Sequence, residues 1–430
     1  MSAPALFGPR GPLSGTALLP GDKSISHRAL IVAALAVGTS RIVGLNDGED
    51  VAATAAALRA MGARIAREGD EMVVTGVGLG TLLQPEAPLD CGNSGTTARL
   101  LMGLIASHPI RAELIGDASL SRRPMGALAI PLRRIGAGIE GERLPLRIQG
   151  AAPAVPFFHR LAAPSAQVKS ALLLAALNTP GVTTVISPAA TRDHLERMLP
   201  LFGAEVTTEG RAISLRGEPD LRPCDVSIPG DASAAAFLAV AAALVPGSMV
   251  ELPGVGMNPG RIGWIEALRE MGADIATANE REQSAESVAD LFIRHSSLSA
   301  IDLAAERIPG LIDEIPILAV AAAGARGTSR LRGLAALRAK ESDRIAATAA
   351  GLAAIGVKAE IAGDDLILHG VGDAPFAGGA TIAARGDHRI AMAFAVAGLR
   401  GRAPLGIDDM SSVSTSFPGF AAALDALAAA

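Results

Sequence analysis

Basic side chains in this chain recur beside glycine and serine at points where a polar cluster opens into an apolar segment. Gly21-Asp-Lys-Ser-Ile-Ser-His-Arg28 places Lys23, Ser24 and Arg28 directly ahead of such a segment. If the segment is a helix, the cations lie at its positive end, where they are unfavourable unless an anion is bound. The other interpretation is a solvated helix start that the serines cap. The misplaced cations favour the first interpretation, a site for a dianion such as a phosphate.

A second basic cluster, Lys340-Glu-Ser-Asp-Arg344, combines two cations with the carboxylate of Glu341. On a helix, Lys340 and Arg344 would lie four residues apart on one face and repel each other by roughly 0.2–0.5 kcal/mol. A structural salt-bridge face is the other interpretation of this cluster. Asp313 opens a further apolar segment, where it could also serve as a helix cap.

Taken together, these clusters predict a clamp for phosphates and carboxylates that also carries acid–base groups. Arg122-Arg-Pro and Asp387-His-Arg389 add weaker signals, since either could be an ordinary surface pair. The cations near predicted loop–helix junctions are Lys23, Arg28, Arg123, Lys169, Arg192, Lys340, Arg344 and Arg389.

Motifs for other chemistries do not hold up. Gly76-Val-Gly-Leu-Gly80 has the wrong spacing for a dinucleotide-binding turn, and prolines rather than a helix follow it. Gly21-Asp-Lys-Ser differs from a P-loop because Asp22 separates the glycine from the lysine. The seven histidines are scattered, and no Cys-x-x-Cys or His-Glu-x-x-His occurs. We therefore expect no metal and no cofactor.

The elements that must position these side chains form a repeat. Polar-to-apolar openings occur six times, 65 to 83 residues apart, at Gly21, Gly92, Ser165, Gly230, Asp313 and Gly386. An apolar helix with almost no charged residues is a buried helix. Between these openings lie amphipathic segments that end at Gly62, Gly136, Gly203, Gly272 and Gly356, each typical of a helix with a glycine C-cap and a strand after it. The pattern predicts an α/β fold of six units, each with one buried helix, one surface helix and about four strands.

The chain length predicts two domains of three units each, because 430 residues exceed one ordinary core. We expect residues 21–229 to form the N-terminal domain. Residues 1–20 and 230–430 would form the C-terminal domain, because the sixth unit lacks a strand that residues 13–19 could supply.

Composition narrows the class of protein. A net charge of −5 argues against non-specific nucleic-acid binding. The longest uncharged run, residues 232–246, is shorter than the ~20 residues that span a bilayer. No secretory signal opens the sequence, and two cysteines do not make a disulfide framework. We expect a cytoplasmic protein with no membrane or nucleic-acid partner.

Eight collinear motifs between about residue 13 and Phe420 make the chain resemble the EPSP synthase family, the 3-phosphoshikimate 1-carboxyvinyltransferases. They are PGDKSISHR, GNSGTTARL, GDASLSRRPMG, SAQVKSALLLA, TRDH, IDEIP, KESDR and GDHRIAM. The resemblance implies two domains of three βαβαββ repeats each, with the helices inside, as an inside-out α/β barrel. The residues of these motifs are most similar to those of the bacterial group that often tolerates the herbicide glyphosate.

The resemblance also implies an activity in the shikimate pathway of aromatic amino acid biosynthesis. The carboxyvinyl group of phosphoenolpyruvate moves to the 5-hydroxyl of shikimate 3-phosphate and phosphate is released, with no cofactor and in a monomer. Phosphoenolpyruvate would bind to Lys23, Gly95, Arg123, Gln167, Arg344 and Arg389. Shikimate 3-phosphate would bind to Lys23, Ser24, Arg28, Ser165, Ala166, Gln167, Arg192, Asp313 and Lys340. Asp313, Glu341 and Lys23 would be catalytic, with Asp313 taking the hydroxyl proton and Glu341 protonating the methylene carbon.

Two alternatives and one departure remain open at this point. A related enolpyruvyl transferase acts on a UDP-sugar and typically carries a cysteine in the loop aligned with residues 116–124, which here has none. A catalytically silent anion-binding scaffold is the other alternative, and the presence of Asp313 and Glu341 argues against it. Many family members carry a lysine where this chain has Thr415, so no cation is assigned there.

Overall fold

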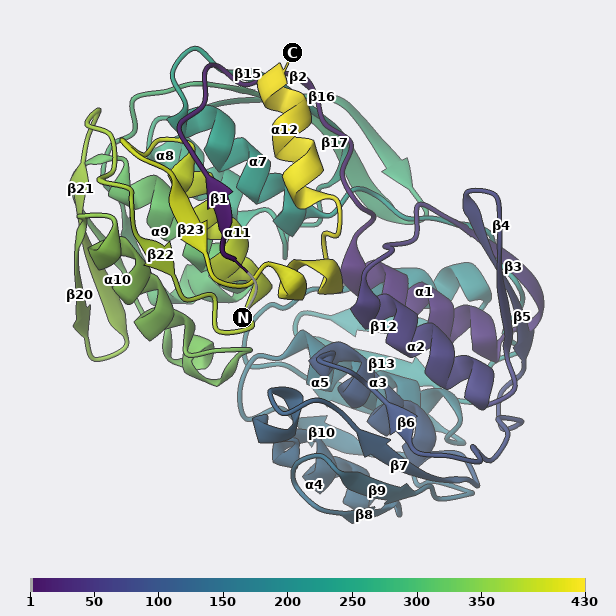
Figure 1. The fold of residues 1–430 in the computed structure, drawn as a ribbon. Helices are drawn as coiled ribbons and strands as arrows, with labels where there is room; N and C mark the ends of the chain where they lie inside the picture. The colour runs from purple at the N-terminus through teal and green to yellow at the C-terminus, as the bar shows by residue number, and fades with distance from the viewer. Residues whose placement is uncertain (1–2, 430) are drawn as a thin grey trace. The chain divides into compact units, whose positions relative to one another are not determined.

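The computed structural model describes residues 3–429 and divides them into two compact units (Figure 1). The N-terminal unit contains Gly21–Ile228 together with the short segment Gln283–Glu286. The C-terminal unit contains the chain up to Pro20, Pro229–Glu282 and the chain from Ser287 onward. Each unit carries three of the six repeats.

Three four-stranded sheets make up the N-terminal unit, and they share one topology. In the spatial order across each sheet given below, the first and second strands pair in parallel, and the two remaining pairs are antiparallel. The first sheet orders β14 (Val226–Ser227), β3 (Val37–Val43), β5 (Glu71–Val77) and β4 (Arg64–Glu68). The second orders β6 (Leu89–Asp90), β7 (Arg111–Ile115), β9 (Leu146–Gln149) and β8 (Gly138–Glu140). The third orders β10 (Phe158–Arg160), β11 (Val182–Ile186), β13 (Ala212–Arg216) and β12 (Val206–Glu209).

The C-terminal unit has two four-stranded sheets and one of three strands. The first orders β16 (Asp274–Gln283), β17 (Glu286–Arg294), β15 (Met249–Gly256) and β2 (Ser14–Thr16). The second orders β18 (Asp302–Leu303), β19 (Arg326–Leu331), β21 (Asp365–Val371) and β20 (Lys358–Ala362). The third orders β1 (Ala5–Phe7), β23 (Leu405–Ile407) and β22 (Thr381–Ile382).

The predicted closure of the sixth repeat is wrong in its details. Within residues 13–19, strand β2 forms, but it pairs in parallel with β15 of the fourth repeat. The strand that joins the sheet of the sixth repeat is β1, which pairs antiparallel with β23 (Figure 1). Strand β1 was not predicted, because it is only three residues long and is flanked by proline and glycine.

Six helices start at the predicted polar openings and are buried along most of their length. They are α1 (Lys23–Leu35), α3 (Gly95–Ala106) and α5 (Ala166–Leu177) in the N-terminal unit, and α7 (Ala232–Leu244), α9 (Ile315–Ala323) and α11 (His388–Gly398) in the C-terminal unit. All thirteen residues of α7 are buried, as expected for a helix that is apolar on every side. The predicted α/β fold of repeated units with buried helices is confirmed.

The outer helices close as the glycine pattern predicts. They are α2 (Glu49–Ala60), α4 (Gly126–Arg134), α6 (His194–Met198), α8 (Gly263–Glu270) and α10 (Arg344–Ala354); a further helix, α12 (Phe420–Ala429), ends the described chain. All five predicted C-cap glycines have positive φ, between 80° and 106°. The α6 segment continues as a 3₁₀ turn, Leu199–Phe202, because Pro200 removes a backbone donor. None of the helices in residues 3–429 is both long and apolar enough to cross a bilayer.

The turn between β16 and β17 belongs to the N-terminal unit, which the sequence did not predict. The Ser227 amide donates to Ser284 Oγ at 2.9 Å. His194 Nδ1 lies 2.6 Å from Glu286 Oε1, and both side chains are buried. These contacts fix the four-residue segment to α6 and to the end of the third repeat.

Gly103 allows α3 and α5 to lie backbone against backbone. A Cβ atom at Gly103 would lie 2.0 Å from the carbonyl oxygen of Ala171. Alanine in a helix interior normally stabilises by about 0.5–1 kcal/mol relative to glycine. A methyl group forced against backbone costs about 1–3 kcal/mol, which outweighs that gain.

We therefore expect Gly103→Ala to lower the free energy of unfolding by about 1–2 kcal/mol, measured by denaturant titration of the purified protein. Gly126→Ala is the matched control, because Gly126 opens α4 and its nearest neighbour to an added Cβ is Glu142 at 3.9 Å. Equal stability of Gly103→Ala and the control would contradict the close approach of α3 and α5.

Candidate functional site

The start of α1 brings the first basic cluster of the N-terminal unit together with carboxylates. Asp22 caps the helix by accepting a hydrogen bond from the Ile25 amide at 2.9 Å. Lys23 Nζ lies 2.9 Å from Asp50 Oδ2, and only 14% of the lysine side chain is exposed. The helix start is therefore capped by an aspartate and not by serines, as the alternative interpretation of this cluster would have had it, and Lys23 is held in place by Asp50 of α2.

Arg28 lies one turn further along α1 and is almost completely buried. Its Nη1 donates to the carbonyl oxygen of Ser24 at 2.7 Å, and its Nη2 donates to Ser170 Oγ of α5 at 2.9 Å. The guanidinium thus connects two buried helices and is oriented by neutral oxygens.

The starts of α3 and α5 meet through Gln167. Its Nε2 donates to Thr96 Oγ1 at 2.9 Å, and its Oε1 accepts from Arg99 Nη1 at 2.9 Å. A Cβ atom at Gly95 would lie 2.7 Å from Arg99 Nη1 and 3.1 Å from Arg123 Nη1. Gly95, Gln167 and Arg123, which the sequence assigned to one ligand, are therefore neighbours in the structure.

Other predicted residues of the N-terminal unit lie nearby along α5 and the loop before α6. Ser165 caps α5 by accepting from the Val168 amide at 3.3 Å, and Ala166 is the first helical residue. Arg192 is half-buried in the loop before α6. Lys169, which the sequence counted among the anion-binding cations, is instead buried with its Nζ 2.5 Å from Glu196 Oε1. The charge of Lys169 is therefore matched within the N-terminal unit by Glu196.

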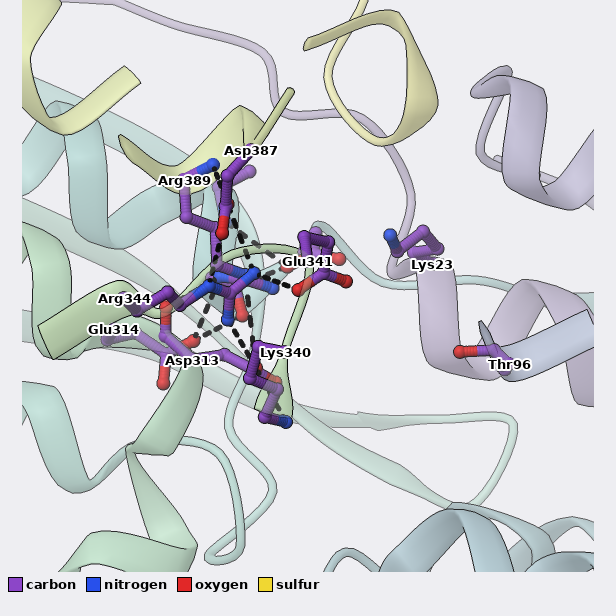
Figure 2. A network of polar contacts seen from close by, with 12 residues as sticks. Lys23, Thr96, Asp313, Glu314, Lys340, Glu341, Arg344, Asp387 and Arg389 are labelled. Carbon is purple, nitrogen blue, oxygen red and sulfur yellow. Dashed lines mark hydrogen bonds and ion pairs between the residues drawn. The ribbon is translucent and has the colours of Figure 1, made fainter. Parts of the chain in front are cut away.

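In the C-terminal unit, Asp313 is the meeting point of the predicted cations (Figure 2). Its Oδ1 lies 3.3 Å from Arg344 Nη1, 3.6 Å from Lys340 Nζ and 3.9 Å from Arg389 Nε. Arg389 also donates from Nη1 to the carbonyl oxygen of Asp313 at 3.0 Å. The turn before α9, the loop before α10 and the start of α11 therefore converge on one carboxylate.

Arg344 is the most deeply buried cation of this cluster, with 1% of its side chain exposed. Asp387, which is itself fully buried, accepts from Nε at 2.8 Å and from Nη2 at 3.2 Å. Glu341 Oε2 accepts from Nη2 at 2.5 Å. Burial opposes the charged form, but the carboxylates of Asp387, Glu341 and Asp313 outweigh it and raise the pKa of the Arg344 guanidinium.

Two possibilities raised for this cluster do not apply. Lys340 and Arg344 do not share a helix face, because α10 begins at Arg344 and Asp343 caps it. Asp313 does not occupy the cap position of α9, which is held by Glu314, and the Glu314 side chain makes no capping bond. The cations here face four carboxylates, those of Asp313, Glu314, Glu341 and Asp387.

Thr415 lies in the 3₁₀ turn Ser411–Thr415, and its Oγ1 donates to the carbonyl oxygen of Ser412 at 2.7 Å. Its hydroxyl thus stabilises its own turn.

Across residues 3–429, no three His, Cys, Asp or Glu side chains are grouped so that they could hold a metal ion.

Asp387, Glu314 and Arg99 are the residues that sequence reasoning missed. An aspartate two residues before Arg389 at a helix start is a capping signal, and the Asp387 carboxylate does accept from the Arg389 amide at 3.0 Å. The other two carry no local signal. Glu314 contacts Ser233 on α7, and Arg99 contacts Gln167 on α5.

The sequence profile described as EPSP synthase (3-phosphoshikimate 1-carboxyvinyltransferase) matches residues 8–424. The chain belongs to this family. It is 54% identical to a 3-phosphoshikimate 1-carboxyvinyltransferase of Sphingopyxis alaskensis, over 99% of this chain and 98% of the relative. It is 56% identical to the protein of that name from Acidiphilium cryptum, over 96% of this chain and 94% of the relative.

Solved structures give the same family and the same fold. The EPSP synthase of Acinetobacter baumannii superposes with a TM-score of 0.87 at 43% identity, covering 98% of this chain and 97% of that one. The enolpyruvyl transferase NikO of Streptomyces tendae has a TM-score of 0.80 at 19% identity and covers 99% of this chain and 98% of its own. The second likeness concerns the fold alone.

His27 links the basic end of α1 to the stability of the protein. Its Nδ1 lies 2.7 Å from Thr54 Oγ1 in a fully buried position. Burial, and then the charges of Lys23 and Arg28, hold the pKa of His27 well below its usual value. The unfolded chain takes up a proton near pH 6.5 that the folded chain refuses, so protonation favours unfolding below that pH.

The contribution of neutral His27 is therefore fully present above about pH 6.5 and is lost as the pH falls toward the lowered pKa, by at most about 1.4 kcal/mol per pH unit. We expect the melting temperature of the wild type to fall more steeply between pH 7.5 and 5.5 than that of His27→Asn, whose amide can still reach Thr54. Parallel pH profiles for the two proteins would show that His27 is not the source.

Proposed function

We propose that this chain transfers the carboxyvinyl group of phosphoenolpyruvate to the 5-hydroxyl of shikimate 3-phosphate and releases phosphate. The observation that carries the proposal is the identity of 54% and 56%, over nearly the whole chain, to relatives named for this reaction. The convergence of Lys340, Arg344 and Arg389 on Asp313 supports it, because the reaction needs cations and a proton acceptor together.

The proposed assignments follow the motifs. Phosphoenolpyruvate binds to Lys23, Gly95, Arg123, Gln167, Arg344 and Arg389, and shikimate 3-phosphate binds to Lys23, Ser24, Arg28, Ser165, Ala166, Gln167, Arg192, Asp313 and Lys340. The planar forks of arginine suit carboxylates and phosphates, whereas Lys23 can serve two ligands as a point charge. We also propose that the protein acts as a monomer in the cytoplasm and needs neither a cofactor nor a metal.

In the proposed mechanism, protonated Glu341 gives its proton to the methylene carbon of phosphoenolpyruvate, and the adjacent carbon becomes cationic. The 5-hydroxyl oxygen bonds to that carbon as Asp313 takes the hydroxyl proton, which gives a tetrahedral intermediate. The bond from this carbon to the phosphate oxygen then breaks, and the departing phosphate takes the proton that Asp313 had accepted. The methyl group returns a proton to Glu341, and the vinyl double bond forms again.

The contacts of Glu341 suggest how its proton affinity changes during the reaction. Its carboxylate lies 2.5 Å from Arg344 Nη2, an arrangement that favours the ionised form and makes it a poor acid. A substrate carboxylate that takes over this guanidinium would release Glu341 and raise its proton affinity. Binding of phosphoenolpyruvate thereby prepares the acid that protonates it.

An assay of phosphate release with phosphoenolpyruvate and shikimate 3-phosphate tests the proposal directly. The same assay with UDP-N-acetylglucosamine as the acceptor tests the related transferase, which the absence of a cysteine in residues 116–124 argues against. Release with shikimate 3-phosphate alone among the acceptors is expected. No release with either acceptor would favour a silent anion-binding scaffold.

Asp313→Asn and Glu341→Gln should each lower turnover by roughly 10²–10⁴-fold, the usual size of an acid–base contribution. Both variants should keep their fold, because neither side chain caps a helix and Arg344 retains Asp387, its most deeply buried partner. Asp425→Asn is the control, since Asp425 is a largely exposed carboxylate paired with Arg10. Turnover measured beside thermal melts decides the outcome, and near-normal turnover of either variant would remove that residue from the mechanism.

Gly95 is expected to make the enzyme sensitive to glyphosate, although the motif residues of the chain resemble those of the tolerant group. Gly95 is the first residue of α3 and does not have a left-handed backbone, so a turn does not require glycine there. A methyl group would instead press on the guanidinium ends of Arg99 and Arg123.

Gly95→Ala should therefore weaken glyphosate inhibition by roughly 5–150-fold, the equivalent of 1–3 kcal/mol, and raise the KM for phosphoenolpyruvate much less. The glyphosate Ki and this KM are measured for both proteins. A wild type that is insensitive to millimolar glyphosate would refute the first expectation, and equal losses for both ligands would refute the second.

A further inference from the structure

Glu314 is a buried carboxylate to which the proposed mechanism gives no task. It lies in the 3₁₀ turn before α9, beside Asp313, and its side chain has no exposed surface. Its Oε1 accepts a short hydrogen bond from Ser233 Oγ. Its Oε2 has no hydrogen-bond partner among residues 3–429. A buried carboxylate with one oxygen unsatisfied calls for an explanation.

The nearest cation to Glu314 is Arg389, one of the proposed phosphoenolpyruvate ligands. Arg389 Nη1 lies 3.8 Å from Glu314 Oε1, and Figure 2 labels both residues in the network around Asp313. The same Nη1 donates to the Asp313 carbonyl oxygen at 3.0 Å. Glu314 and the backbone of Asp313 therefore both attract one end of the Arg389 guanidinium.

A second buried arginine fixes the other side of Glu314. Arg261 Nη2 donates to Ser233 Oγ at 3.0 Å and to Asp231 Oδ1 at 2.9 Å, at the first turn of α7. The Ser233 hydroxyl accepts a hydrogen bond from Arg261, so its own proton is free to be donated to Glu314. The side chain at position 314 must therefore offer an acceptor oxygen to Ser233. The order of contacts is therefore Arg261, Ser233, Glu314 and Arg389, all buried.

This arrangement is a poor way to gain stability. A buried charge without full pairing is disfavoured, and apolar residues of similar size in such places are often at least as stable. The carboxylate is therefore better explained by its effect on the guanidinium that it faces. A group that is fixed by buried neighbours can hold a ligand-binding side chain in one orientation.

We propose that Glu314 is a positioning residue that orients Arg389 for phosphoenolpyruvate, with Ser233 and Arg261 holding Glu314 in turn. The inference rests on the proposed function. Glu314 draws one end of the guanidinium inward, which leaves the remaining donors directed at the ligand. Its charge also stays opposite Arg389 when Asp313 takes a proton during the reaction.

The test measures steady-state kinetics of Glu314→Gln, Ser233→Ala and the wild type by phosphate release, with each substrate varied in turn. Glu314→Gln keeps the size of the side chain and one acceptor oxygen but removes the charge. We expect its KM for phosphoenolpyruvate to rise roughly 10–100-fold, with kcat changed less than about threefold. Binding of shikimate 3-phosphate alone, measured by calorimetry, should change less than about twofold.

The control is Glu266→Gln, the same chemical change at a largely exposed position of α8. It should match the wild type in all constants. An unchanged KM for phosphoenolpyruvate in Glu314→Gln would overturn the inference while leaving the function intact. Equal losses for both substrates, with a lower melting temperature, would also overturn it, since they indicate a structural role.

If Glu314→Gln does not fold, Ser233→Ala decides alone. A rise of the KM for phosphoenolpyruvate of about threefold or more supports the inference, and an unchanged value overturns it. A wild type that releases no phosphate from these substrates overturns the proposed function and the inference together.

Discussion

The C-terminal unit is organised around the buried guanidinium of Arg344, whose charge is stabilised by the carboxylates that surround it. Arg344 opens α10, and three different segments supply its partners: Asp387 at the start of α11, Asp313 before α9 and Glu341 in the preceding loop. Breaking such a buried pair typically costs several kcal/mol, so these starts are held in register with one another. The side chains that are proposed to bind substrate are therefore also the ones that keep the helix starts together.

The N-terminal unit orients its cations by different means. Arg28 is held by a backbone carbonyl and a serine hydroxyl, and Gln167 is held between Thr96 and Arg99. Around Arg344, by contrast, carboxylates supply the contacts and stabilise the charged form of the guanidinium. In the proposed function, a substrate carboxylate would exchange places with one of these carboxylates of the protein.

Local signals in the sequence were sufficient for much of this architecture. The six buried helices were predictable because each is apolar on all sides and opens at a polar cluster, and the five closing glycines because each needs a left-handed backbone. Contacts between distant segments were not predictable. The pairing of Lys169 with Glu196 was not predictable because Glu196 lies on another helix, and Glu314 was overlooked because Ser233 is 81 residues away along the chain. The segment that contains β2 was predicted to join the sixth repeat, but β2 pairs with β15 of the fourth repeat. The partner was not predictable because a three-residue strand carries no register information of its own.

The pairing of β1 with β23 has a consequence for the order in which the protein forms on the ribosome. The first strand to be synthesised finds its partner only after Leu405–Ile407 have emerged, and β2 waits for Met249–Glu251. Chain segments that leave the ribosome early and pair late close very long loops, and such closure is slow. The three repeats from Gly21 to Ile228 have all their own strands available long before that. Nascent chains should therefore carry three repeats with complete sheets and an unpaired leading segment until translation is almost complete, and a circular permutant that moves this segment behind Ala430 would shorten the wait.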